Sequence, residues 1–321
     1  MPDRPSEFEL IAQLFAPLAK GAHGAFGLLD DAALLSPQAG QEFVVTVDGL
    51  VEDVHFLAND PADMVARKSL RVNLSDLAAK GAEPAGYLLA LILPKTTGMD
   101  WLRGFARGLE DDQKQFAIPL LGGDTTSTPG PLTISITAFG WVPKGQMIRR
   151  EGAHAGDPVF VSGSIGDAGG GLACLKEGKD NADLIRRYRL PEPRLALGRE
   201  LRGIASACLD VSDGLIADLG HIAEVSKVRI AIDAPAIPRS KALRALWGES
   251  EEALVRAATA GDDYELAFTA PASKRDAVHD AAARARVAVS EIGRVEAGAG
   301  VVLRNRTGRE IPVARRGWTH F

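Results

Sequence analysis

The chain has few cysteines and no long run of apolar residues. Only two of its 321 residues are cysteines, Cys174 and Cys208, and neither lies in a CxxC motif, so a disulfide framework or zinc site is not expected. Both thiols are interpreted as buried core residues. The longest apolar run, residues 87–93, is much shorter than the roughly 20 residues that cross a bilayer. We therefore expect a strand buried on both faces there, and no membrane partner.

Positive charge is also scarce. The chain has 37 lysines and arginines against 42 acidic residues, for a net charge of -5, which excludes a nucleic-acid binder that works through a broad basic surface. The first residues lack the apolar core of a signal peptide, so a cytoplasmic protein is expected. A hydrophobic content of 46% and a charged content of 25% are typical of globular proteins.

The length of the chain is sufficient for two ordinary domains. A glycine-rich polar segment at residues 151–158 predicts a boundary between domains 1–150 and 151–321. The pattern near the N-terminus predicts an amphipathic helix over residues 7–18, followed by a glycine-rich loop.

Acidic residues recur where predicted apolar elements meet short Gly, Ser or Thr segments. The strand at residues 43–48 is expected to end at Asp48, and the strand at 119–121 to run into a glycine turn before Asp124. The five places are Asp30-Asp31, Asp48, Asp76, Asp124 and the segment from Asp210 to Asp213.

Each of these places also has a plain structural interpretation. Asp30 suits a helix or turn cap and Asp48 a tight turn. Asn73, Ser75 and Asp76 indicate either side-chain oxygens with a function inside one helix or a break between two helices. The glycine loop at residues 163–171 suits an anion site or an ordinary turn between a strand and a helix.

Taken together, the five places predict an oxygen-rich site for several Mg²⁺ ions, because Mg²⁺ prefers oxygen ligands and relieves repulsion between carboxylates. Several such ions usually accompany polyphosphate. The pattern therefore predicts a nucleotide-dependent phosphoryl transferase that lacks a P-loop and the protein-kinase motifs.

Seven segments in order along the chain resemble the thiamine-monophosphate kinase family. They are LDDAA at 29–33, TVDGLVEDVHF at 46–56, NLSDLAA at 73–79, GGDTT at 122–126, DVSDGL at 210–215, GDDYEL at 261–266 and GWTHF at 317–321. The resemblance implies transfer of the ATP γ-phosphoryl group to thiamine monophosphate, giving thiamine diphosphate. It also implies the two-domain α/β (α+β) fold of aminoimidazole ribonucleotide synthetase. The N-terminal domain would then bind ATP and Mg²⁺ and form a homodimer through its sheet, closing a barrel.

Site residues follow from the resemblance position by position. The implied Mg²⁺ ligands are Asp30, Thr46, Asp48, Asp76, Asp124, Asp210 and Asp213. The implied ATP contacts are Gly123, Asp124, Arg150 and Ser212, and the implied thiamine-phosphate contacts are His55, Asp262 and Trp318. No general base is expected, because the acceptor phosphate oxygen is already ionised near neutral pH.

Three positions depart from the family pattern. Leu29 stands where the family usually has glycine, Asp262 where it usually has glutamate, and Lys80, to which we attach no function, where it usually has methionine. Two alternatives to the kinase remain: a sister ATP-dependent enzyme of the same fold, and a catalytically silent nucleotide-binding regulator. Against the regulator, all seven ligand positions keep an oxygen-bearing side chain.

Overall fold

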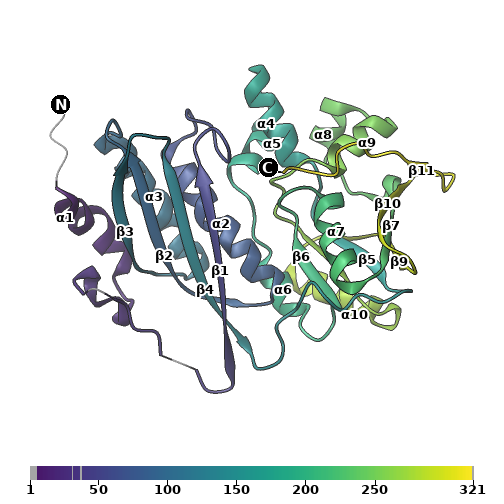
Figure 1. Cartoon of the computed structure of the whole chain (residues 1–321), viewed down its shortest axis with the longest axis horizontal. Helices are drawn as coiled ribbons and strands as arrows, with labels where there is room; N and C mark the ends of the chain where they lie inside the picture. The colour runs from purple at the N-terminus through teal and green to yellow at the C-terminus, as the bar shows by residue number, and fades with distance from the viewer. Residues whose placement is uncertain (1–5, 31, 37, 320–321) are drawn as a thin grey trace. The chain divides into compact units, whose positions relative to one another are not determined.

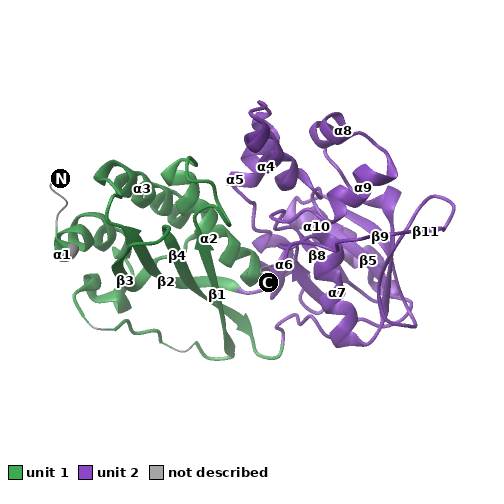
Figure 2. Cartoon of the chain, turned by 45° about the horizontal axis from the view of Figure 1, so that its top comes forward, with its two compact units in different colours: residues 1–77, 83–145 green, residues 78–82, 146–321 purple. Residues whose placement is uncertain are grey.

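The computed structural model describes residues 6–30, 32–36 and 38–319. The chain forms two compact units, coloured separately in Figure 2. Unit 1 contains residues up to 77 together with 83–145, and unit 2 contains residues 78–82 and 146 onward. Each unit is built on its own β-sheet.

Unit 1 is built on a four-stranded sheet in the order β1-β4-β2-β3 (Figure 1). Its strands are β1 (Gln41–Val51), β2 (Glu83–Pro94), β3 (Leu120–Thr128) and β4 (Thr133–Pro143). β4 pairs antiparallel with both β1 and β2, whereas β2 and β3 run parallel. The parallel pair is joined by a helical crossover, as the geometry of parallel strands requires.

Helices α2 (Ala62–Ala79) and α3 (Met99–Phe116) cover one face of this sheet (Figure 1). The two helices pack closely at Gly108, because this residue has no side chain: a Cβ there would lie only 2.3 Å from the backbone oxygen of Asp63. Arg71 forms two hydrogen bonds with the buried carboxylate of Asp112, at 2.6 and 2.9 Å. This bidentate pair gives the buried charge its partner.

In unit 1, one sequence prediction is wrong and one open alternative is excluded. β2 is buried mainly on one face: Tyr87, Leu89 and Leu91 are buried, whereas Leu88 and Ala90 on the other face are half-buried. Of the two interpretations of residues 73–76, the break between two helices does not occur, because α2 is continuous. Packing of its apolar residues outweighs the low helix propensity of the polar ones.

The N-terminal helix expected over residues 7–18 is also divided. It consists of α1 (Glu7–Leu10), the π-helix η1 (Ile11–Phe15) and the 3-10 helix η2 (Ala16–Ala19). Pro17 lies at the start of η2, and proline lacks the N–H that a continuing helix needs. The expected glycine loop contains a further 3-10 element, η3 (His23–Leu28).

Unit 2 is built on a seven-stranded sheet in the order β11-β10-β7-β9-β5-β8-β6. Its strands are β5 (Pro158–Ser162), β6 (Ala207–Asp210), β7 (Arg229–Asp233), β8 (Leu266–Thr269), β9 (Val289–Glu296), β10 (Gly300–Arg304) and β11 (Glu310–Ile311). Only the β10–β7 pairing is parallel among the pairs of this sheet in the described chain.

The helical elements of unit 2 are α4 (Asp167–Glu177), α5 (Ala182–Arg189), α6 (Leu195–Glu200), α7 (Leu215–Ser226), η4 (Ala234–Ala236), α8 (Lys241–Trp247), α9 (Glu251–Ala258), η5 (Ala272–Lys274) and α10 (Arg275–Ala285).

Hydrophobic clusters cover both faces of the unit 2 sheet. Val159 and Val161 of β5 lie in the cluster that contains α7, whereas Phe160 between them lies in the cluster that contains α6 and α10. Successive residues of a strand point to opposite faces, which explains why every residue of β5, β6 and β8 is buried. Cys174 and Cys208 are both buried and free, as expected.

No helix in the described part of the chain is long and apolar enough to cross a membrane.

Candidate active site

Three of the predicted metal ligands meet on the helix-covered face of unit 1. The Thr46 hydroxyl on β1 donates a hydrogen bond to the Asp76 carboxylate on α2. Burial, and then the neighbouring charge of Asp76, raises the pKa of Asp48 to about 7. The two carboxylates therefore repel one another in the absence of a cation.

The buried end of α2 adds oxygens to this group. Asn73 lies three residues before Asp76, so both lie on the same side of the helix. Asn73 Nδ2 donates to the Ser69 carbonyl at 3.1 Å, while Asn73 Oδ1 and Ser75 Oγ have no hydrogen-bond partner within the described residues. Two buried oxygens without partners are unusual in a folded protein and are suitable acceptors for a ligand.

Asp124 lies on the opposite face of the same sheet. Asp48 pairs with Ile136, Ile136 with Leu89, and Leu89 with Gly123, so these residues share a face. Asp124 is the next residue and points to the other face. The expected glycine turn before Asp124 is wrong, because Gly123 lies inside β3. A Cβ there would lie 1.9 Å from the Leu89 carbonyl oxygen.

A cavity of about 610 Å³ lies over this second face. It is lined by Asp30, Gly123 and Asp124, together with residues of η1 such as Phe15. Asp30 and Asp124, which are far apart in sequence, thus border one pocket whose size suits a small ligand. Asp31, the second member of the predicted acidic pair, lies outside the described residues.

His55 is held in a defined tautomer in the turn that follows β1. Its Nδ1 accepts a hydrogen bond from the Val51 N–H at 3.0 Å, so in the neutral ring the hydrogen is on Nε2. The buried Lys68 donates to the His55 carbonyl at 2.9 Å. The backbone and the ring of His55 are both fixed by neighbours.

In unit 2 the loop between β6 and α7 gathers predicted residues from three distant segments. The Asp262 N–H donates to the Ser212 carbonyl at 2.8 Å, and the Trp318 N–H donates to the Asp213 carbonyl at 2.9 Å. A Cβ at Gly317 would lie 2.5 Å from the Asp213 carbonyl oxygen. Glycine at that position therefore permits the close approach of the C-terminal segment.

One carboxylate that sequence reasoning missed organises this loop. Asp218 on α7 is buried, and its Oδ2 accepts hydrogen bonds from the N–H groups of Ser212, Asp213 and Gly214, each at 3.0 Å. Burial, then the charges of Asp210 and Asp213, raises the pKa of Asp218. An acidic residue in the first turn after DVSDGL was the available signal, because such residues cap helix N-termini.

The segment after Asp262 contains two further buried carboxylates that were missed. Asp263 accepts from the Gly166 and Ala168 N–H groups at 2.6 and 3.1 Å, at the start of α4. Glu265 accepts from Arg187 at 2.7 Å and from two nitrogens of Arg194. These contacts hold residues 262–265 against the rest of unit 2, and Asp262 has a positive φ of 69°.

Two more predicted residues belong to unit 2. Asp210 is buried at the end of β6. Arg150 is exposed and follows Arg149, whose carbonyl accepts a hydrogen bond from the Cys208 N–H at 2.9 Å. Arg150 therefore lies beside the strand that leads to Asp210.

The residues present fit Mg²⁺ in chemical type, since they supply carboxylate, hydroxyl and amide oxygens. They lie in several separate groups: Thr46 with Asp48 and Asp76, Asp30 with Asp124, and Asp210 with Asp213. Within residues 6–30, 32–36 and 38–319, no three His, Cys, Asp or Glu side chains converge in a group that would hold a metal.

Comparison with known protein families shows the class of protein to which this two-unit chain belongs. Residues 29–142 match the model of AIR synthase related protein, N-terminal domain, and residues 154–305 match that of the corresponding C-terminal domain. The chain is thus a two-domain α/β protein of the AIR synthase related type, as the sequence predicted.

Individual relatives identify the family within this class. The chain is 46% identical to a thiamine-monophosphate kinase of Caulobacter vibrioides, with 98% of this chain and 91% of that protein covered. A solved thiamine-monophosphate kinase from Stenotrophomonas maltophilia K279a is 44% identical, with a TM-score of 0.85, covering 93% of this chain and 96% of that one. AaThiL complexed with AMPPCP and TMP is 30% identical, with a TM-score of 0.77, covering 94% and 98%. The chain belongs to the thiamine-monophosphate kinase family.

Proposed function

We propose that this protein transfers the γ-phosphoryl group of ATP to thiamine monophosphate, giving thiamine diphosphate. The observation that carries the proposal is the meeting of Ser212, Asp213, Asp262 and Trp318 around one loop. These residues come from three distant segments that the family resemblance marks as site segments. The similarity to AaThiL, solved with AMPPCP and TMP, supports the same pair of substrates.

Mg²⁺ is assigned to the oxygen-bearing side chains. The proposed ligands are Asp30, Thr46, Asp48, Asp76, Asp124, Asp210 and Asp213. The raised pKa of Asp48 supports this assignment, because a cation next to Asp48 and Asp76 would relieve their repulsion. When bound, Mg²⁺ neutralises charge on the phosphate oxygens of the two substrates.

ATP is assigned to Gly123, Asp124, Arg150 and Ser212. The pocket that Gly123 and Asp124 line supports this assignment in unit 1. The exposed Arg150 has a guanidinium whose planar donors suit phosphate oxygens.

Thiamine monophosphate is assigned to His55, Asp262 and Trp318. His55 presents Nε2–H as a donor, since its Nδ1 already accepts from Val51. Trp318 is 48% exposed, with the guanidinium of Arg315 5.5 Å from its ring centroid, and we assign the exposed part of the ring to stacking on the cationic thiazolium. Asp262 supplies a carboxylate, one methylene shorter than the glutamate usual in the family.

No protein side chain is assigned as a general base. The acceptor is a phosphate oxygen that is already ionised near neutral pH. The task of the protein is to bring two anions into line and to hold them there, which accounts for most of the catalysis in phosphoryl transfer.

We further propose that residues 1–150 form the ATP- and Mg²⁺-binding domain and that two copies of it make a homodimer through the sheet of unit 1. On the face opposite the helices, Val45 and Val47 are 55% and 61% exposed. Phe43 stacks beside them on Phe139, with ring centroids 5.2 Å apart. An exposed apolar sheet face of this kind typically marks a protein interface. Residues 151–321 form the second domain.

The proposed use of ATP also bears on the cellular location of the enzyme. We place the enzyme in the cytoplasm, because ATP is its proposed phosphoryl donor. Cell fractionation followed by an immunoblot tests this assignment, and recovery in another fraction would contradict it.

The test of function is direct. Purified protein is incubated with thiamine monophosphate, ATP and Mg²⁺, and thiamine diphosphate is measured by HPLC, with an EDTA-treated sample as the control. We expect product only when the metal is present. Product of equal yield in EDTA would contradict the metal assignment, and no product with ATP still bound would favour a sister enzyme or a silent binder.

A further inference from the structure

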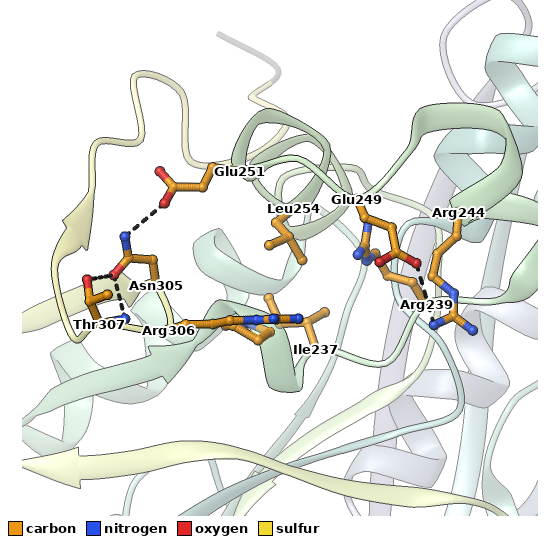
Figure 3. Close-up of a pocket in the computed structure, with 10 residues that line it drawn as sticks. Ile237, Arg239, Arg244, Glu249, Glu251, Leu254, Asn305, Arg306 and Thr307 are labelled. Carbon is orange, nitrogen blue, oxygen red and sulfur yellow. Dashed lines mark hydrogen bonds and ion pairs between the residues drawn. The ribbon is translucent and has the colours of Figure 1, made fainter.

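A second cavity lies in unit 2, and none of the predicted site residues lines it. Its volume is about 510 Å³, which is within the range of small-molecule sites. Three separate segments form its wall: η4 with the residues after it, the stretch from α8 to α9, and the turn between β10 and β11. Figure 3 shows the side chains that line it.

The floor of this cavity is apolar. Ile237 and Leu254 are buried, and Pro235 lines the wall beside them. In Figure 3, Arg306 reaches from the turn side toward Ile237, while Arg239 and Arg244 lie on the opposite side next to Glu249. The cavity therefore combines an apolar surface with guanidinium groups from both sides.

Both acidic residues of the pocket have basic neighbours. Glu251 accepts hydrogen bonds from Asn305 at 2.8 Å and from Arg309 at 2.6 Å. Glu249 lies 3.9 Å from Arg244, and both side chains are largely exposed, so that pair is weak.

Two guanidinium charges are left without a carboxylate in contact. Arg239 donates to the Gly248 carbonyl at 2.9 Å, which is a neutral acceptor, and the charge of Glu249 acts on it without a hydrogen bond between the two side chains. Arg306 forms no hydrogen bond or ion pair with any described residue. Both charges are therefore available to an anion in the cavity.

The turn that carries Arg306 is well ordered by its own hydrogen bonds. Asn305 Oδ1 accepts from the Thr307 N–H at 3.1 Å, the Thr307 hydroxyl at 2.9 Å and the Arg309 N–H at 3.0 Å. A side-chain oxygen that caps the backbone in this way stabilises the turn. The backbone of Arg306 is thus positioned before a ligand arrives, which lowers the entropy cost of binding.

We propose that this cavity binds a small organic phosphate, with Arg239 and Arg306 holding the phosphate and Ile237 and Leu254 packing against the apolar part. Guanidinium groups suit phosphate because their planar donors match its oxygens. An apolar floor and this volume favour a phosphate ester over the free ion. The site is separate from the proposed kinase site and does not depend on its function.

Isothermal titration of the full chain with phenyl phosphate tests the proposal. EDTA is present throughout, so that Mg²⁺-dependent binding at the proposed kinase site does not contribute. Wild-type protein is compared with Arg239→Gln, Arg306→Gln and the control Arg107→Gln, which removes an exposed arginine of unit 1. We expect saturable binding that weakens at least about tenfold in each pocket variant and is unchanged in the control.

Each other outcome overturns a stated part of the proposal. Absence of saturable binding, or equal affinity in the two pocket variants and wild type, would refute the site. Equal affinity for orthophosphate and phenyl phosphate would refute the role of the apolar floor. Because Arg306 is exposed and has no partner in the described chain, its replacement is not expected to disturb folding, and circular dichroism checks this.

Discussion

Asp218 and Asp213 are joined by a hydrogen bond of 3.0 Å from the Asp213 N–H to the Asp218 carboxylate. The same oxygen accepts from the residues on either side of Asp213. One buried side chain thus fixes the backbone of the loop that carries two proposed ligands, Ser212 for ATP and Asp213 for Mg²⁺.

Replacement of this carboxylate should disturb the loop. In Asp218→Ala, three N–H groups lose their acceptor, so we expect the free energy of unfolding to fall by about 1 to 3 kcal/mol. We also expect kcat to fall about tenfold or more, because positioning in the loop is lost. Urea unfolding and the HPLC assay measure the two effects. The exposed Asp180→Ala serves as the control, and wild-type kcat in a folded Asp218→Ala protein would contradict the role.

Loss of Asp124 should abolish turnover. Asp124→Ala removes a carboxylate from the unit 1 pocket, and the loss of a metal ligand is expected to lower kcat by about 100-fold or more. Asp124 is exposed, so stability should remain close to that of wild type. Turnover at the wild-type rate would refute its assignment to the site.

A charge on the open face of the unit 1 sheet should disrupt the proposed dimer. Val47→Glu would bury two unpaired carboxylates in the interface, at a cost of about 3 kcal/mol or more, or at least about 100-fold in Kd. Light scattering during size-exclusion chromatography measures the mass. The control is Val225→Glu. Val225 is also an exposed valine but lies on α7 of unit 2, so this change should leave the dimer intact. A dimer that persists in Val47→Glu places the interface elsewhere.

Asp263 should make stability depend on pH. Burial raises the pKa of Asp263 to about 8, with a smaller contribution in the same direction from Asp167 and opposing ones from Arg187 and the backbone N–H groups. The folded state therefore keeps a proton that the unfolded state releases near pH 4. Between about pH 4 and pH 8, raising the pH lowers the free energy of unfolding, by at most about 1.4 kcal/mol per pH unit from this group.

Urea unfolding from pH 5 to pH 8 checks this sign. Asp263→Asn should flatten the dependence, because the amide does not titrate, whereas Asp180→Asn should retain the wild-type slope. An unchanged slope in Asp263→Asn would show that Asp263 is already ionised in the folded protein.

The cysteines should be unreactive in the folded protein. Burial raises the pKa of the Cys208 thiol to about 12, and Cys174 is buried as well. Because the thiolate is the reactive form, iodoacetamide at pH 8 should label neither residue until a denaturant is added, after which mass spectrometry should show two labels. Rapid labelling of native Cys208 would indicate local opening of β6.

The sequence by itself determined the class of fold and the position of several strands, and it marked the segments to which the site is assigned. These features depend on local patterns: the alternation around Val44, the apolar run ending at Leu93, and acidic motifs such as DVSDGL. Local alternation and composition are read directly along a chain, which explains why the strands expected at residues 43–48 and 87–93 lie within the observed β1 and β2.

Tertiary structure decided which of those residues meet. Asp48 and Asp124 each follow an apolar strand, yet strand register places them on opposite faces of one sheet. Asp218 acquired its role only because α7 turns its carboxylate toward the N–H groups of the loop before it. Register, burial and long-range hydrogen bonds depend on contacts between residues far apart in the chain. Local patterns do not specify these contacts.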